Sequence, residues 1–204
     1  MQVSNEKEEI RRILVIRLGR IGDIILCSLL IRALKKRFPQ AEICMLSKAR
    51  FSVMANVIPG VDKSFTSPRS FFSLLDVRHK LRAAGFDTVI DLQNNQKSRR
   101  YSLVISPSRL FRFHRWRKPR WFFINFPYLR SRIAPPEPMP IQYLQVASSL
   151  GVEDDEIGLN LRVNDDWRTR AEKLLHEYRN EQNINRGDKL LLAAPGASRP
   201  TKIW

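Results

Sequence analysis

The sequence has no apolar run long enough to cross a membrane. Its best candidate, IILCSLLI at residues 24–31, stops at Arg32 and is far shorter than the roughly 18 to 20 residues that a spanning helix needs. The first twelve residues, MQVSNEKEEIRR, are polar and mixed in charge, and they contain no apolar segment of the kind found in signal peptides. These absences predict a cytoplasmic protein without a membrane span.

Cysteine and histidine are scarce. Cys27 and Cys44 are too few for a disulfide framework and too far apart for a metal-binding motif, so we expect both to be buried, reduced thiols. The three histidines, His79, His114 and His176, have neither metal-ligand nor catalytic-triad spacing. The sequence therefore predicts no metal site and no bound cofactor.

The common glycine-rich phosphate motifs are absent as well. The chain contains neither the GxGxxG spacing of dinucleotide-binding proteins nor the GK[ST] ending of a P-loop. It also lacks zinc-finger spacing and the signature of an RNA-recognition module. A nucleic-acid partner is therefore not predicted.

Positive charge, in contrast, is abundant. The chain has 36 Lys and Arg residues against 20 Asp and Glu residues, a formal net charge of +16. Such an excess favours anionic partners in general: nucleic acids, phosphorylated sugars, nucleotides or an anionic membrane surface. Hydrophobic residues make up 43% of the 204 residues, enough for a core, and the length suits one domain with or without part of a second.

Expected strands and helices alternate along the first half of the chain. Apolar runs predict strands at residues 12–17, 41–47, 61–66 and 86–92, and helical spacing predicts helices at 21–37, 51–57 and 73–84. This alternation is typical of an α/β fold with a Rossmann-like parallel sheet and helices on both faces. Ligands of such sheets bind beyond the carboxyl ends of the strands.

The second half of the chain has a weaker pattern. It predicts a helix at 141–150, an acidic surface loop at 153–156, an extended segment at 159–163 and a final strand at 190–194. Before that strand, Asp165 and Asp166 are expected to cap a helix with an apolar face. We place a domain boundary between residues 160 and 161, so that 161–204 forms a linker helix and the start of a second domain.

Two turns follow strands at the edge where ligands are expected. In LGRIGD, residues 18–23, Gly19 and Gly22 permit close approach of a ligand to the backbone, and Asp23 falls in the first turn of the next helix. From the residues alone, Asp23 either complements the helix dipole or acts on a ligand at the sheet edge. The amides of QNNQKS, residues 93–98, either bind sugar hydroxyls or form Asx turns.

A basic and aromatic stretch follows. Lys97 to Arg132 contains eleven Lys and Arg residues and no Asp or Glu, interleaved with Phe, Trp and Tyr. It would suit nucleic acid through phosphate contacts and base stacking. It would also suit an anionic membrane or glycolipid, with the aromatic rings in the interface. In the third interpretation the rings pack in the core and the arginines are solvated; we favour a combination of the second and third.

The last fifteen residues, LLLAAPGASRPTKIW, combine an apolar run, a turn with Gly and Ser, and a nearby Lys202. One interpretation is an anion-binding element, in which backbone N–H groups at the turn meet a phosphate. The other is an ordinary turn followed by a surface lysine.

Three motifs occur in one order: the strand with RLGRIGD, then FDTVIDLQNNQKS, then LLLAAPGASRPTKIW. This series resembles glycosyltransferase family 9, the heptosyltransferases that add heptose to the inner core of lipopolysaccharide. The resemblance runs from about Arg12 to the last residue. It implies the N-terminal half of a GT-B fold, in which two Rossmann-like domains face each other, followed by a truncated donor-binding domain.

The resemblance also implies a reaction and its residues. The family transfers a sugar from a nucleotide-diphosphate donor, usually ADP-heptose, with inversion and without a metal. Asp23 occupies the position of the family's base, and Ser198, Thr201 and Lys202 match its contacts to the donor phosphates. The acceptor-side loops would be formed by Gly19, Arg20, Gly22, Gln93, Asn94, Lys97 and Ser98.

The expected partners are therefore a nucleotide-sugar donor and a lipopolysaccharide-type glycolipid acceptor, met at the inner face of the inner membrane. With most of the second domain missing, we expect this chain to be inert or nearly so by itself. Two rivals are a non-enzymatic basic module that binds acidic glycolipid or an anionic membrane, and a nucleic-acid binder.

Overall fold

The computed structural model describes residues 9–68, 72–114, 125–126, 137–185 and 187–191. The chain divides into two compact units, residues 1–162 and 163–204. In the second unit, the described residues contain one helix, α8 (Asp165–Glu181). The domain boundary placed at 160 and 161 from the sequence stays a prediction.

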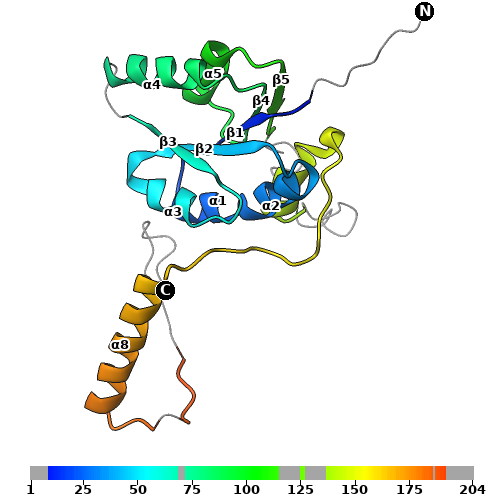
Figure 1. Ribbon diagram of the computed structural model, residues 1–204. Helices are drawn as coiled ribbons and strands as arrows, with labels where there is room; N and C mark the ends of the chain where they lie inside the picture. The colour runs from blue at the N-terminus through cyan, green and yellow to red at the C-terminus, as the bar shows by residue number, and fades with distance from the viewer. Residues whose placement is uncertain (1–8, 69–71, 115–124, 127–136, 186, 192–204) are drawn as a thin grey trace, which may run out of the picture. The chain divides into compact units, whose positions relative to one another are not determined.

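The first unit is built on a five-stranded parallel sheet in the order β3–β2–β1–β4–β5 (Figure 1). The strands are β1 (Arg12–Ile16), β2 (Glu42–Lys48), β3 (Lys63–Ser67), β4 (Thr88–Asp91) and β5 (Arg109–Arg112). The chain moves outward from β1 to β3 and then returns to add β4 on the other side of β1. Strand order therefore reverses between β1 and β4, which is the topological switch point of the sheet.

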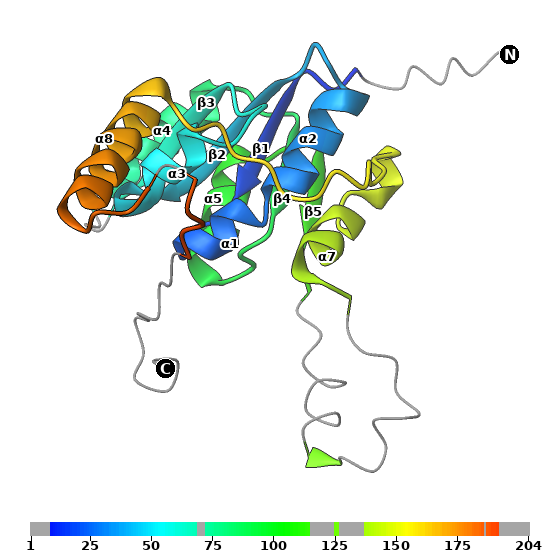
Figure 2. The same ribbon diagram turned by 90° about the horizontal axis from the view of Figure 1, so that it is seen from below.

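Helices cover both faces of this sheet, which confirms the predicted α/β fold class. One face carries α1 (Ile21–Ile25), α2 (Ser28–Arg37), α3 (Ser52–Asn56) and α7 (Met139–Gln145), and the other carries α4 (Phe72–Ala83) and α5 (Gln96–Ile105) (Figures 1 and 2). Two short 3₁₀ helices, η1 (Ala49–Phe51) and η3 (Ser148–Leu150), follow β2 and α7.

The core follows from the alternation of side chains along the strands. On β1, Ile13 and Val15 pack toward α1, α2 and α7, and Leu14 and Ile16 pack toward α4 and α5; all four are fully buried. A strand buried on both faces reads as a continuous apolar run, which is why RILVI was recognisable in the sequence.

The helix expected at residues 21–37 is broken in the structure. The helix α1 ends at Ile25 and α2 begins at Ser28. Between them the Cys27 N–H donates to the Ile24 carbonyl, three residues back, and the Cys27 thiol donates to the Asp23 carbonyl at 3.2 Å. This tight turn replaces the regular ladder, so the prediction of one continuous helix was wrong.

The sequence prediction also missed α5 and β5. Residues 93–98 were interpreted as a turn, but a capping box at Asn95 and Ser98 starts α5 inside that segment. The strand β5 is short and has arginine at both ends, so it carries no apolar run. Both lie in the basic stretch from Lys97 to Arg132, of which residues 115–124 and 127–132 are outside the described ones.

Of three smaller expectations in the second half, one is confirmed and two are corrected or lie partly outside the described residues. The Asn164 side chain, not Asp165 or Asp166, caps α8, because its oxygen accepts the Trp167 N–H at 2.8 Å. The predicted acidic surface loop at 153–156 is confirmed: Glu153, Asp154 and Glu156 are exposed, and Asp155 binds Arg32. Leu190 and Leu191 are not in a strand, and the remainder of the strand expected at 190–194 lies outside the described residues.

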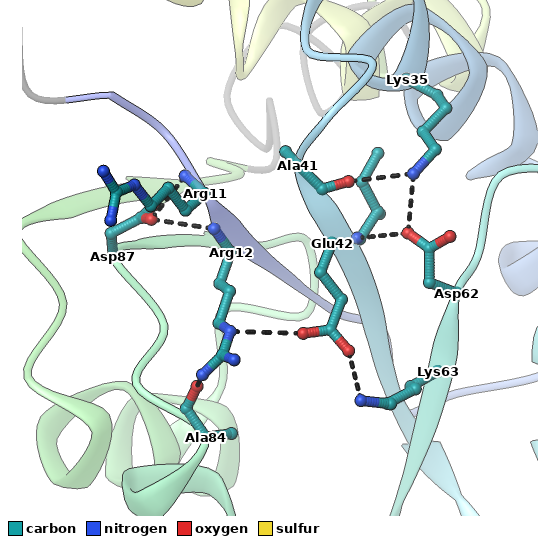
Figure 3. Close-up of polar contacts among 10 residues, drawn as sticks. Arg11, Arg12, Lys35, Ala41, Glu42, Asp62, Lys63, Ala84 and Asp87 are labelled. Carbon is teal, nitrogen blue, oxygen red and sulfur yellow. Dashed lines mark hydrogen bonds and ion pairs between the residues drawn. The ribbon is translucent and has the colours of Figure 1, made fainter.

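A network of charges ties the amino ends of the strands together (Figure 3). Glu42 lies between Arg12 of β1, at 3.3 Å, and Lys63 of β3, at 2.6 Å. One oxygen of Asp87 accepts the backbone N–H groups of both Arg11 and Arg12 at 2.8 Å. Both carboxylates bind side chains or backbone N–H groups of neighbouring strands, so this edge of the sheet has a structural role.

Asp62 belongs to the same edge. It accepts the Ile43 N–H at 2.8 Å and the Lys35 ammonium at 2.9 Å (Figure 3). Burial raises the pKa of Asp62, but the hydrogen bonds from Lys35 and Ile43 outweigh it and hold that pKa below its ordinary value.

Both cysteines are buried and unpaired with each other, as the sequence predicted. Burial raises the pKa of each thiol to about 12, so both stay protonated at neutral pH. Among the helices that the structure describes, none is long and apolar enough to cross a bilayer.

Candidate functional site

The two turns singled out in the sequence meet at the switch point of the sheet. The first leaves the carboxyl end of β1 at Arg17, and the second leaves the carboxyl end of β4 at Leu92, on the neighbouring strand. Open parallel sheets bind their ligands at this place, because the two loops diverge to opposite faces and leave a crevice between them.

Asp23 lies at this edge in the first turn of α1, with its side chain about one third exposed. Its Oδ2 is 2.7 Å from Nη2 of Arg17, the residue that directly follows β1. Within the described residues, Oδ1 receives no hydrogen bond and is the oxygen left for a ligand. The structure thus gives Asp23 a specific partner, besides the helix dipole considered from the sequence.

Arg17 is the functional residue that sequence reasoning missed. Its Nη1 donates to the Leu92 carbonyl at 2.7 Å, and its guanidinium carbon lies 5.4 Å from the ring centre of Tyr143 on α7. The side chain is only 13% exposed. One indication of this role was present in the sequence: Arg17 directly follows an apolar strand. A charged side chain that is buried at a strand end needs a partner there.

Gln93 joins the two loops. Its Oε1 accepts the Leu18 N–H at 3.2 Å, and a Cβ added to Gly19 would lie 3.6 Å from that oxygen and 3.8 Å from Oδ2 of Asp23. Gly19, Gln93 and Asp23 are therefore brought together, as the sequence predicted for one site. The lack of a side chain at Gly19 leaves the space between them open.

The carboxylate of Asp91, the last residue of β4, holds the turn that follows this strand. Its Oδ1 accepts the N–H groups of Gln93 at 3.0 Å and Asn94 at 2.8 Å, and the carboxylate is fully buried. Asn94 has a φ of 43°, in the left-handed region that asparagine tolerates, and its amide donates to the Phe113 carbonyl at 2.9 Å. Asn94 therefore shapes the loop through contacts within the protein.

Lys97 and Ser98 are held within the protein. Ser98 is fully buried: its N–H donates to Oδ1 of Asn95, and its hydroxyl accepts the Asn95 N–H, both at 2.9 Å. Lys97 donates to the Pro68 carbonyl at 2.7 Å, and burial, together with the charge of Lys48, lowers the pKa of Lys97. Both residues start α5 at the site, and neither points to a ligand as a surface group would.

Arg20 and Gly22 complete the first loop. Arg20 precedes α1 with a φ of 30°, unusual for a residue with a side chain, and it is exposed. A Cβ added at Gly22 would meet nothing within 4 Å, so the space next to that glycine is open. The predicted donor contacts Ser198, Thr201 and Lys202 lie outside the described residues.

The chemistry of this edge is that of one partly exposed carboxylate, Asp23, among cations, since Asp91 is fully buried. Arg17 holds one Asp23 oxygen, and exposed Arg20 lies in the same loop. At the same edge, exposed Lys48 is the last residue of β2 and exposed Arg50 follows it. No group of three or more metal-ligating side chains occurs in the part of the chain that the structure describes. A carboxylate oxygen is present to accept a proton, and positive charge is present to attract an anionic ligand.

Comparison with known proteins agrees with this fold. Lipopolysaccharide heptosyltransferase 1 of Campylobacter coli is 24% identical over 196 residues, which are 95% of this chain and 57% of that protein. The crystal structure of a glycosyl transferase family 9 protein from Veillonella parvula superposes with a TM-score of 0.74 at 22% identity, over 96% of this chain and 57% of the other. This chain is therefore similar to glycosyltransferase family 9 proteins in sequence and in fold.

Further comparisons define how much of a family member is present. The ADP-heptose lipopolysaccharide heptosyltransferase II of E. coli superposes with a TM-score of 0.55 at 19% identity, over 86% of this chain and 51% of that structure. This chain thus spans about half the length of the relatives that it matches, with the α/β fold of one half of their GT-B structures. No family model matches its sequence.

Proposed function

We propose that this chain supplies the acceptor-binding half of an inverting, metal-independent heptosyltransferase. The donor would be a nucleotide-diphosphate heptose such as ADP-heptose, and the acceptor a sugar hydroxyl of a lipopolysaccharide inner-core-type glycolipid. The observation that carries this proposal is the Asp23 carboxylate, held on one oxygen by Arg17 at the switch point and open on the other.

In the proposed step, Oδ1 of Asp23 accepts the proton of the acceptor hydroxyl. The hydroxyl oxygen forms a bond to the anomeric carbon of the donor sugar as the bond from that carbon to the diphosphate breaks on the opposite face. The nucleotide diphosphate leaves with the electron pair, and the configuration inverts. A positioned base of this kind contributes about 10²- to 10⁴-fold to a rate.

The other proposed contacts follow from charge. Ser198, Thr201 and Lys202 would bind the donor diphosphate, where a cation offsets the charge that develops on the leaving group. On the acceptor side, the loops with Gly19, Arg20, Gly22, Gln93 and Asn94 would bind sugar hydroxyls and the phosphate or carboxylate groups of the glycolipid.

The base assignment is tested by Asp23→Asn, with exposed Asp166→Asn on α8 as the matched control. In this chain extended by the donor-binding domain of a family 9 relative, we expect Asp23→Asn to lower the rate of heptose transfer, followed by mass spectrometry of the acceptor, by about 10²- to 10⁴-fold. Acceptor affinity, measured separately by calorimetry, should change by no more than about twofold, because the amide has the shape of the carboxylate. Transfer at the original rate by Asp23→Asn would show that Asp23 is not the base.

The rival function, a basic module without catalysis, makes a different prediction. It expects acidic glycolipid to bind in proportion to the net charge of the variant, so Asp23→Asn and Asp166→Asn should both strengthen binding slightly and equally. We favour catalysis over this rival because Asp23, with one open oxygen, lies at the switch point. A module that only attracts anionic ligands would gain nothing from a negative carboxylate at that place.

A further inference from the structure

The layer formed by α4 and α5 has an outer surface that the proposed reaction does not use. Exposed cationic side chains follow one another along both helices: Arg78, Lys80 and Arg82 on α4, and Arg99 and Arg100 on α5, with His79 among them. In sequence, α5 contains no acidic residue and α4 contains one, Asp76. This surface therefore has a strong excess of positive charge.

The same surface exposes an apolar side chain. The inward face of α5 is formed by Ser98, Tyr101, Ser102 and Ile105, which are all buried. Leu103 points the other way and is 74% exposed, one turn from Arg99 and Arg100. An exposed leucine among arginines is typical of a surface that meets the boundary between lipid head groups and acyl chains, whereas it contributes little to binding of nucleic acid phosphates.

A shallow hollow connects the two helices. It has a volume of about 240 Å³ and is lined by Arg78, His79, Arg82 and Val104. Arg78 and Arg82 are one helical turn apart, so their guanidinium groups are on the same side of α4. Two guanidinium groups at one hollow match the geometry and charge of a phosphate group.

We propose that this α4–α5 face, formed by Arg78, Arg82, Arg100, Leu103 and Val104, docks on an anionic phospholipid bilayer. Head-group phosphates would bind at the hollow between Arg78 and Arg82, and Leu103 would enter the interface. Because α5 begins at Gln96, directly after the Gln93–Asn95 turn, docking by this face brings the switch-point edge close to the bilayer. The inference rests on the surface of α4 and α5, and it stands whether or not Asp23 is a base.

The experiment is co-sedimentation of the chain with vesicles. One set is phosphatidylcholine alone, and the other contains about one third phosphatidylglycerol. Reversing the charge of two arginines at such a surface should weaken binding about thirtyfold or more. We expect binding only to the anionic vesicles, decreasing with salt. Arg78→Glu with Arg82→Glu should weaken it by that factor, and Leu103→Asn should weaken it further.

The matched control is Lys36→Glu with Arg37→Glu, two exposed cations at the end of α2, which covers the other face of the sheet (Figure 1). Both double variants have the same net charge, so a general charge effect would weaken them equally. The proposal would be overturned if the two double variants were weakened equally, or if Arg78→Glu with Arg82→Glu bound as tightly as the original protein. Equal binding to vesicles without phosphatidylglycerol would also overturn it. Circular dichroism of every variant checks that the helical content is unchanged. Tighter binding to an oligonucleotide than to anionic vesicles would also contradict the proposal.

Discussion

At the scale of single residues, Arg17 explains how a carboxylate is held at a cationic edge. Its guanidinium contacts the Asp23 carboxylate, the Leu92 carbonyl and the Tyr143 ring, so it connects the first loop, the end of β4 and α7. Interactions between charged partners of this kind contribute more to the stability of the fold than hydrogen bonds between neutral groups. Truncating one partner also leaves the other charge without its counterpart.

Removing Arg17 should therefore cost stability. Arg17→Met retains much of the side-chain volume but loses the ion pair, and we expect the free energy of unfolding to fall by about 1–3 kcal/mol. Urea denaturation of the chain measures it. The exposed Lys36→Met is the control, expected within about 0.5 kcal/mol of the original protein. An Arg17→Met protein as stable as the original would show that the pair contributes nothing to the fold.

Residues also show where sequence interpretation succeeded and where it stopped. Gly19, Gln93 and Asp23 were expected in one site because two strand ends of a parallel sheet lie at one edge, and the structure brings them together. Arg17 was not recognised, since its role depends on Leu92 and Tyr143, which are distant in sequence. Ser98 was expected in a ligand-binding loop, but it lies in the capping box that starts α5. The two could not be told apart in the sequence, because a capping box contains the same residue types as a polar turn.

At the scale of elements, α2 is tied to the segment that follows η3. Arg32 binds Asp155 through two hydrogen bonds, from Nε at 2.6 Å and Nη2 at 2.5 Å, and Nη2 also donates to the Gly158 carbonyl. The hydrogen bond from Arg32 lowers the pKa of Asp155 to about 2. Beyond it, the Asn160 N–H donates to the Ser28 hydroxyl, so this segment is fastened along α2.

This pair gives the protein a predicted acid sensitivity. The folded pKa of Asp155, about 2, is below the roughly 3.9 of an unfolded aspartate, so the pair's stabilisation is present above about pH 4 and is lost as the pH falls toward 2. We expect the free energy of unfolding to fall more steeply between pH 4 and pH 2 in the original protein than in Asp155→Asn. Urea titrations at several pH values measure the two slopes, and parallel slopes would contradict the assignment.

The elements that the sequence predicted correctly share a physical reason. The strands β1 and β2 each have four consecutive buried apolar residues, 13–16 and 43–46, whereas β5 has two apolar residues between its terminal arginines. The break between α1 and α2 could not be predicted from the spacing of apolar residues, because that spacing continues through it. The hydrogen bond from the Cys27 thiol to the Asp23 carbonyl leaves no trace in this spacing.

At the scale of the whole first unit, the two edges of the sheet differ in how their charges are used. At the amino edge, Glu42, Asp62 and Asp87 each bind cations or backbone N–H groups within the fold (Figure 3). At the carboxyl edge, Asp23 retains one open oxygen among Arg20, Lys48 and Arg50. We therefore assign ligand binding to the carboxyl edge and structural support to the amino edge.

The most direct test of this assignment is an NMR titration of the isotope-labelled chain with a soluble inner-core oligosaccharide that retains its phosphate groups. We predict amide shifts confined to residues 17–23 and 92–97, reduced by substitution of Gly19 with valine, whose side chain would fill the space between Gln93 and Asp23. Shifts centred instead on Glu42, Asp62 and Asp87, with none at residues 17–23, would contradict it.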